Sequence, residues 1–426
     1  MRNFRALIAC ALGVMLIGTT LSAADADGTN VQAELAQIRA DIKRLNDART
    51  SMGMTLPFTV DGYVDVTGNY NFNRSPSRQS LARAYATNAD TFTLNVAQVN
   101  FHRDAAKGSI VGFNVQLDFG ENARVQNTAT NPTGTYNDVA DIEAAYIDIL
   151  VPGHEDCGIT AGKFATWEGI EVMESTLNPV ISRGFLFLYA EPLTHVGVFT
   201  HYTHDVNGMD LNVKLGAVNG WDLEADNNAD KDFIWYIGLT KSKLFDAHLN
   251  GTWGDEQTAS GGTTGHKAGH PRTSVDLTGY VNPMGPSNTD LTINYQLNWG
   301  SEKDPAAGIH YAHWAGMAIE PVYVFSNSPN WSLAGRFEVF DDHSGVRANG
   351  LTADEPQTMY NITLCPAYKV SDACTVRGEY RYDWSNLNRG TGGRAFEDSK
   401  GADNLDHQST LMIELLYSFT TAPTPQ

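Results

Sequence analysis

Cysteine is scarce in this chain, with 4 residues among 426. Cys10 lies in an N-terminal apolar segment, which leaves Cys157, Cys365 and Cys374, an odd number with no CxxC spacing. Neither a disulfide scaffold nor a cysteine zinc site fits this pattern. If residues 371–372 form a hairpin turn, Cys365 and Cys374 point to opposite faces of their strands, so we predict no disulfide between them.

Basic residues are also few, since 29 Lys and Arg stand against 49 Asp and Glu and give a formal net charge of -20. This balance excludes nucleic acid as a partner, because binding to phosphates requires clustered Lys and Arg. Long apolar runs are missing after residue 24, whereas a membrane-spanning helix needs roughly 18 to 20 apolar residues. If the chain crosses a membrane, it must therefore do so as strands.

Motifs of catalysis and of cofactor binding are absent as well. The segment GITAGK at 158–163 is one residue short of a phosphate-binding loop and lacks the following Ser or Thr. No GxSxG nucleophile motif occurs. The closely spaced histidines would point to opposite sides of a strand or lie in a Gly-rich segment, and neither arrangement favours a metal. These pairs are His201 and His204, His310 and His313, and His266 and His270. We expect no enzyme activity, no metal and no cofactor, although a Ser and a His could still converge in the fold.

The N-terminus carries the apolar segment ALIACALGVMLIGTTL, preceded by Arg2 and Arg5 and followed by small residues at 22–24. This pattern predicts a cleaved signal peptide over residues 1–24, and therefore export. A lipoprotein cleavage box ending at Cys10 competes with this interpretation, but only a few residues precede it. Cleavage removes two positive charges, so the mature net charge is 27 - 49 = -22.

Residues 25–57 contain one predicted helix, with apolar residues at heptad spacing: Val31, Leu35, Ile38, Ile42 and Leu45. Two heptads alone are marginal in water. These apolar residues would form one stripe along the helix, which we call the heptad seam. It fits either a short periplasmic coiled coil or an amphipathic helix that lies against the mouth of a barrel. The mixture of residue types at its two core positions is closer to trimeric than to dimeric coiled coils, so we predict a homotrimer.

From Phe58 onward the sequence alternates with period two. In FTVDGYVDVTGNYNFN at 58–73 one face is apolar, while the other face is polar and includes Asp61 and Asp65. Later segments alternate in the same way and carry charges on their polar face. These charges are Arg336, Glu338, Arg377, Glu379, Arg381 and Asp383. One face of such strands can contact lipid, while the other must line a water-filled lumen.

The connections between strand candidates alternate between short turns and long loops. About 16 candidates occur, joined by seven short turns and eight long loops, and an even strand number places both chain ends on the periplasmic side. We expect an all-β transmembrane antiparallel barrel over 58–419, followed by a tail over 420–426. A barrel of this size leaves an aqueous lumen rather than a packed core. The long loops cover approximately 74–90, 121–137, 165–193, 219–232, 254–272, 300–308, 341–356 and 385–407.

The segment from 161 to 199 carries several short motifs. They are Gly-Lys-Phe at 162–164, Gly-x-Glu at 169–171, Asn178, Ser-Arg at 182–183 and Pro-x-x-His-x-Gly at 192–197, followed by GAVNGWD at 216–222. In these motifs the chain resembles the OmpL-like family of β-barrel porins, and the family pattern extends loosely over most of Phe58 to Phe419.

The resemblance implies an outer-membrane porin of a Gram-negative-type cell, which contacts outer-membrane lipids and lets small hydrophilic solutes and ions diffuse passively. It implies no particular solute. One departure is the end of the chain, because outer-membrane barrels usually finish on an aromatic residue, whereas TTAPTPQ follows Phe419 here.

The third long loop, at 165–193, is unusually apolar for a solvent-exposed connection. By analogy with porins we expect it to fold into the lumen and narrow it. The charges of this predicted pore constriction are Lys163, Glu168, Glu171, Glu174 and Arg183. Carboxylates outnumber basic groups there, which predicts a modest cation preference that fades as salt rises. The alternative is a loop on the rim or on a neighbouring subunit, and the alternative function is a structural or adhesive surface barrel with a plugged lumen.

Overall fold

The computed structural model describes residues 57–421 except 107, 131–138, 229, 257–269, 307–308, 349–354 and 388–393. The predicted signal peptide at 1–24, the heptad seam at 31–45 and His266 lie outside the described residues, as does the tail from 422 onward. None of the described helices is long and apolar enough to cross a membrane.

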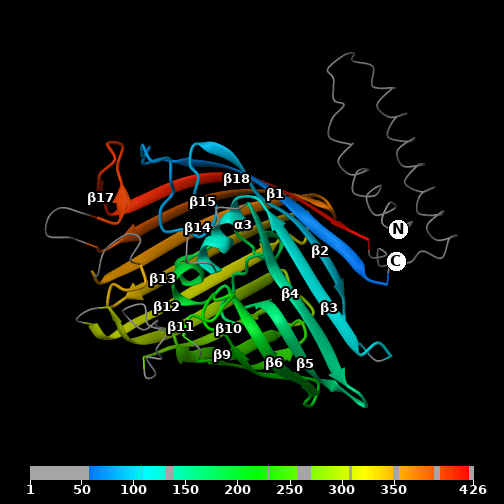
Figure 1. Ribbon diagram of the computed structural model, residues 1–426. Helices are drawn as coiled ribbons and strands as arrows, with labels where there is room; N and C mark the ends of the chain where they lie inside the picture. Colours follow the sequence, from blue (N-terminus) through cyan, green and yellow to red (C-terminus); the bar gives the residue numbers. More distant parts are fainter. Residues whose placement is uncertain are drawn as a thin grey trace, which may run out of the picture. The chain divides into compact units, whose positions relative to one another are not determined.

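Sixteen antiparallel strands close into a barrel, as the sequence predicted (Figure 1). The first strand, β1 (Thr59–Asn71), pairs with the last, β18 (His407–Thr420), and each of the other barrel strands pairs with the barrel strands before and after it in sequence. A separate short hairpin, β16 (Phe396–Glu397) and β17 (Asp403–Leu405), lies in the connection before β18. The remaining strands are β2 (Thr91–Arg103), β3 (Val111–Phe119), β4 (Ala140–Val151), β5 (His154–Ala165), β6 (Thr194–Asp205), β7 (Asp210–Val218), β8 (Asp232–Lys241), β9 (Phe245–Asp255), β10 (Pro271–Val281), β11 (Leu291–Ala306), β12 (Ile309–Val324), β13 (Trp331–Asp342), β14 (Gln357–Ser371) and β15 (Cys374–Ser385).

The two ends of the barrel differ in their connections. Short turns gather at the end where β1 begins and β18 finishes, which we call the turn end, and longer connections gather at the opposite loop end. One loop prediction was wrong in detail. The predicted loop at 300–308 is mostly strand, because β11 continues to Ala306 and β12 starts at Ile309. The connection predicted at 121–137 lies between β3 and β4 and begins with the helix α3 (Glu121–Thr130). The last hairpin turn lies at 372–373, one residue later than predicted.

Alternation along the strands sorts side chains between lipid and lumen. In β1, Tyr63, Asp65 and Thr67 are buried, while Val64 and Tyr70 are exposed. Exposed aromatic residues also gather near both ends of the barrel, as expected for the two membrane interfaces of an outer-membrane barrel. Near the loop end these include Phe92, Phe119, Phe233 and Trp253, and near the turn end Tyr323, Phe325, Trp331 and Phe419.

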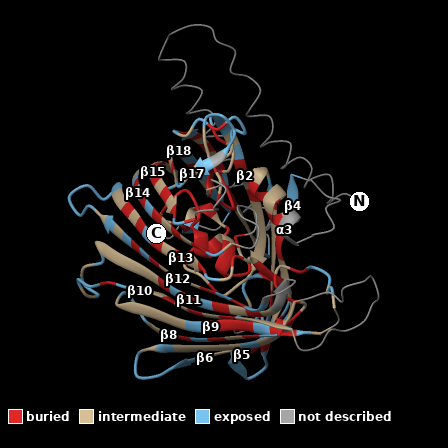
Figure 2. Ribbon diagram, turned by 90° about the vertical axis from the view of Figure 1, so that its left-hand side faces the viewer, coloured by how far each residue is buried: buried red, intermediate tan, exposed pale blue. Residues whose placement is uncertain are grey.

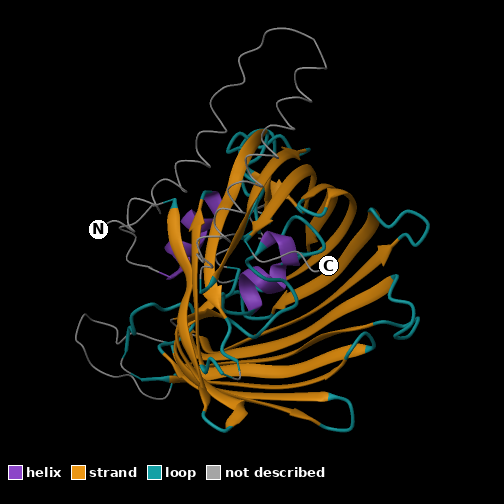
Figure 3. Ribbon diagram, turned by 90° about the vertical axis from the view of Figure 1, so that its right-hand side faces the viewer, coloured by secondary structure: helices purple, strands orange, loops and turns teal. Residues whose placement is uncertain are grey.

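The interior departs from the expectation of a lumen without a packed core. Apolar residues of the connection between β5 and β6, which include Phe185, Leu186 and Tyr189, pack against Trp314 of β12 and Phe340 of β13. Figure 2 shows buried residues inside the ring of strands, and Figure 3 shows a helical segment there. Loop-derived side chains therefore build a core within the barrel.

Candidate pore constriction and vestibule

The connection between β5 and β6, residues 166–193, lies inside the barrel and is called the lumen loop here. Its base is closed by a backbone hydrogen bond from Thr166 N to Leu193 O of 3.0 Å. It contains a 3-10 turn (Ser175–Leu177) and a short π-helical turn (Leu186–Ala190). Because its backbone polar groups are removed from water, they need partners on the barrel wall.

Two wall carboxylates supply acceptors for the backbone of the lumen loop. Glu379 of β15 accepts hydrogen bonds from Ile181 N at 2.6 Å and from Ser182 N at 3.0 Å, and also from the Ser182 hydroxyl. Glu338 of β13 accepts from Phe185 N at 2.8 Å and from Leu186 N at 2.7 Å. Charge-assisted bonds of this kind are about twice as strong as neutral ones.

Wall arginines supply the matching donors. Arg336 donates to Ser182 O at 2.7 Å and pairs with Glu171 of the lumen loop. Arg381 donates to Arg183 O at 2.6 Å. Arg377 donates to the carbonyls of Ser175 and Asn178 and pairs with Glu414 of β18. All three arginines are buried, so these contacts take the place of the hydrogen bonds to water that their guanidinium groups lose on burial.

The predicted lumen-wall residues therefore separate into two groups. Asp65 belongs with the wall charges around the lumen loop, because it accepts a hydrogen bond of 2.8 Å from the Ser175 hydroxyl. Asp383 is buried and pairs with Arg381. Asp61 lies apart near the turn end, where it contacts His102 at 2.8 Å.

Most predicted constriction charges are engaged within the protein. Arg183 donates to the carbonyls of Val172, Ile181 and Met173, each at 2.8 Å, and so braces the lumen loop from inside. Lys163 of β5 pairs with Asp141 at 3.6 Å and with Glu224 at 2.9 Å. Glu174 accepts a hydrogen bond from the Thr176 hydroxyl.

Glu168 fastens the other side of the lumen loop. Its Oε1 accepts hydrogen bonds of 2.7 Å from Thr252 of β9 and from Ser274 of β10. Burial, reinforced by the nearby charges of Asp276 and Asp222, raises the pKa of Glu168 to about 8. This carboxyl is therefore neutral at pH 7 and adds no negative charge to the predicted constriction.

A second loop, 72–90, also enters the barrel, and the sequence reasoning missed it. Arg83 donates to the Thr410 hydroxyl at 2.7 Å and lies 3.5 Å from Asp383. Asn69 of β1 donates to Ala86 O at 3.0 Å. Burial, with the like charge of Arg381, lowers the pKa of Arg83 to about 10. The small and apolar run LARAYA at 81–86 was the available signal.

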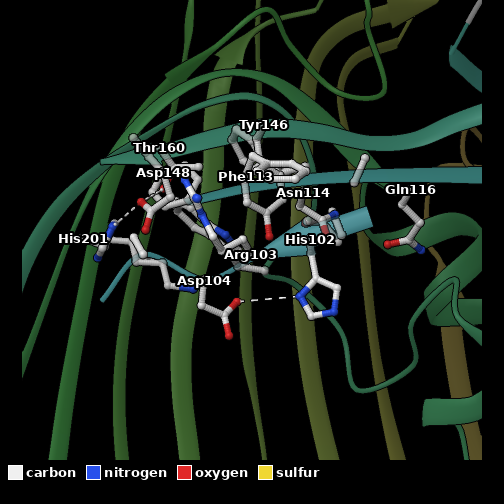
Figure 4. Close-up of a pocket in the computed structure, with 18 of the residues that line it drawn as sticks. His102, Arg103, Asp104, Phe113, Asn114, Gln116, Tyr146, Asp148, Thr160 and His201 are labelled. Carbon is white, nitrogen blue, oxygen red and sulfur yellow. Dashed lines mark hydrogen bonds and ion pairs between the residues drawn. The ribbon is translucent and has the colours of Figure 1, made fainter. Parts of the chain in front are cut away.

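A cavity of about 550 Å³, called the vestibule here, borders β2 to β7 and the start of the lumen loop. It extends from Arg103 and Asp104 near the turn end to Trp167. Figure 4 shows His201 and Asp148 facing each other in its wall, and their side chains are 2.8 Å apart. Lys214 and Phe199 also line this cavity, although period two was the only sequence signal for them.

Residues 57–419 match the family described as "Putative beta-barrel porin-2, OmpL-like". The chain belongs to this family. It is accordingly an outer-membrane porin-family barrel, as the motifs between 161 and 222 predicted. Comparison with curated protein sequences found no match.

Solved structures of outer-membrane proteins resemble this porin-family barrel in fold. The anion-selective porin from Comamonas acidovorans has a TM-score of 0.55 with 10% identity, over 85% of this chain and 99% of its own. In-vitro folded OmpT, an outer membrane protein of Vibrio cholerae, has a TM-score of 0.52 with 12% identity, over 86% and 98%. The outer membrane channel DcaP of Acinetobacter baumannii has a TM-score of 0.51 with 10% identity, over 86% and 99%. At these identities the likeness concerns the fold alone.

Proposed function

We propose that this porin-family barrel lets small hydrophilic solutes and ions diffuse passively across the outer membrane, and that the lumen loop narrows the path. One observation carries the proposal. The lumen loop is fixed to β13 and β15 on one side and to β9 and β10 on another, while a cavity with both polar and apolar lining borders β2 to β7. A loop held at several points of the wall can define a constant bore.

The charged residues of the lumen loop have partners within the protein, and this changes the ion selectivity that we expect. Glu171 is paired with Arg336, Glu168 is neutral at pH 7, and Arg183 faces backbone carbonyls. These groups support the shape of the constriction more than its charge. We propose that selectivity depends on the vestibule lining, in place of the cation preference expected from the carboxylates of the lumen loop.

The rest of the chain completes the arrangement that we propose. Residues 1–24 direct export and are cleaved, residues 25–57 lie in the periplasm, and residues 58–419 form the barrel before a periplasmic tail at 420–426. These assignments rest on the sequence patterns and on the family, because the N-terminal segments and most of the tail lie outside the described residues.

A structural or adhesive barrel with a plugged lumen is the second candidate function. The apolar core inside the barrel favours it, because Trp221 and Phe396 from two further loops join the lumen loop there. Under this proposal the core would close the bore and the outer connections would carry the function.

Single-channel recording of the purified protein in a planar bilayer separates the two candidates. We expect stepwise KCl currents from the wild type, and larger or noisier steps from a Glu338→Gln/Glu379→Gln double variant. At position 338 the amide of Gln turns a donor toward one of the two backbone N–H groups that Glu338 bonds, one through each carboxylate oxygen. At position 379 Gln keeps an oxygen acceptor for the backbone but loses the negative charge that strengthens these hydrogen bonds, so both substitutions loosen the lumen loop. Asp372→Asn, in an exposed turn at the turn end, is the control and should conduct like the wild type.

The outcomes discriminate clearly. A wild type that inserts but passes no current supports the plugged barrel. Currents that are the same in the double variant and the wild type would assign the constriction to another part of the barrel. Heat-modifiable gel migration verifies that each variant is folded.

A further inference from the structure

The ammonium group of Lys214 lines the vestibule without a carboxylate partner among the described residues. Its Nζ lies 4.7 Å from the ring centre of Tyr236 and 5.2 Å from that of Trp167. Aromatic faces attract a cation but do not neutralise it. An ammonium group has three donors, so those turned toward the cavity stay available to a solute.

The carboxylates that line the vestibule have other partners or are exposed to solvent. Asp148 accepts hydrogen bonds of 2.8 Å from His201 and from the Thr160 hydroxyl. Glu143 accepts from Gln98 at 3.3 Å. Asp104 is almost fully exposed near the turn end. Lys163 differs from Lys214 in this respect, because two carboxylates of the protein already compensate its charge.

Next to Lys214 the vestibule has an aromatic wall. Phe199 of β6 meets Phe164 of β5 edge to face, with ring centres 4.8 Å apart, and meets Trp167 in the same way at 5.0 Å. All three rings line the cavity. Solute sites of proteins usually combine such apolar walls with a few placed polar groups that fix orientation.

We propose that the vestibule binds organic carboxylates that have an aromatic or apolar body. The carboxylate contacts Lys214, and the body packs against Phe199 and Trp167. The aromatic wall favours such a solute over a small inorganic anion, and the uncompensated ammonium favours it over a neutral solute of the same shape. Arg103, which lines the vestibule near the turn end and donates to Val111 O, adds positive charge along the approach. This inference rests on the proposed channel function and names its solute class.

Block of the KCl current by benzoate at pH 7.5 tests the inference, with benzamide as the neutral analogue and acetate as the anion without a ring. We expect benzoate to block the wild type at concentrations at which benzamide and acetate have little effect. Lys214→Met should raise the half-blocking benzoate concentration about tenfold, as for the loss of a charge-assisted contact. Lys214→Arg should restore most of the block.

Two further variants complete the design. Lys241→Met removes an exposed lysine outside the vestibule and should leave benzoate block unchanged. Phe199→Leu should weaken block by benzoate while leaving the effect of acetate as it was. Persistent KCl steps in Lys214→Met verify that this variant folds and inserts.

The possible results of these recordings distinguish the channel function, the carboxylate site and the role of the aromatic wall. Absence of KCl steps in the wild type overturns the channel function itself. Normal steps with equal block by benzoate and benzamide, or with unchanged benzoate block in Lys214→Met, overturn the carboxylate site and leave the channel intact. Equal block by acetate and benzoate overturns the aromatic part of the proposal.

Discussion

Glu168 joins the lumen loop to the barrel wall in a crowded acidic environment. Asp276 of β10 accepts a hydrogen bond of 2.6 Å from Gly169 N next to it, and Glu191 at the far end of the lumen loop accepts one of 2.7 Å from Gln296. Burial and the charge of Asp276 also raise the pKa of Glu191 well above its ordinary value. Keeping such carboxyls protonated avoids several buried negative charges at close range.

The stability of the barrel should therefore decrease at alkaline pH, because Glu168 becomes ionised there. The pKa of Glu168 is about 8 in the folded chain and lower in the unfolded chain, so between these two pKa values the folded state binds more protons than the unfolded state. The free energy of unfolding therefore decreases as the pH rises through about 8. Between pH 6 and pH 9 this group alone costs about 2 to 3 kcal/mol. The midpoint of heat-modifiable unfolding, measured across this range, should depend less on pH in Glu168→Gln than in the wild type.

Asp372→Asn is the control for this measurement, because it changes a fully exposed carboxylate in a turn. Its pH profile should follow the wild type. If the profile of Glu168→Gln also follows the wild type, Glu168 is ionised throughout this pH range and contributes a negative charge to the constriction.

At the scale of elements, the strands were predictable and the paths of the loops were not. Period two is a local property, so the inward positions of Arg336 and Glu379 could be inferred from a few neighbouring residues. The contact that gives Glu379 its role is made with Ser182, 197 residues earlier in the chain. No local pattern encodes such a partner. The apolar character of 165–193 indicated an inward path, but it could not indicate which wall charges the loop would neutralise.

The two ends of the barrel lead to a prediction about its orientation. Because β1 begins and β18 finishes at the turn end, both chain ends leave the barrel on the same side. We expect the loop end to face the cell exterior. An epitope tag placed within 257–269 should be labelled by antibody on intact cells, whereas a tag after residue 421 should be labelled only after the outer membrane is permeabilised. Labelling of the C-terminal tag on intact cells would reverse this topology.

At the scale of the whole molecule, the net charge of -20 is a poor guide to what the lumen presents to a solute. Glu171, Glu414 and Asp383 pair with the arginines that hold the lumen loop. Lys214, by contrast, has no carboxylate partner among the residues that the structure describes, and lies beside aromatic rings in the vestibule. We infer that the vestibule presents an ammonium group to solutes although the chain as a whole is acidic. Salt screens the outer charges over about 8 Å at physiological ionic strength, which reduces their influence further.

The heptad seam at 31–45 is the feature that bears on assembly. Its core positions mix Leu and Ile at one position with Val, Ile and Leu at the other, which is closer to trimeric seams than to the dimeric order of β-branched residues followed by Leu. Two heptads alone are too short to associate stably. Their association would need support from barrel walls packed side by side, so we predict a homotrimer in which three seams meet beneath the barrels.

Replacing Ile38 and Ile42 with Asp should convert the trimer to monomers, because it places charges in the apolar seam, while each barrel stays folded and conducting. The matched control is Ala33→Asp/Ala40→Asp, which adds the same charges at the outermost heptad position and should stay trimeric. Light scattering of the detergent-purified proteins, corrected for bound detergent, measures the assembly. A monomeric wild type, or a trimer that survives the Ile38 and Ile42 substitutions, would assign the seam to contact with the barrel mouth instead of self-association.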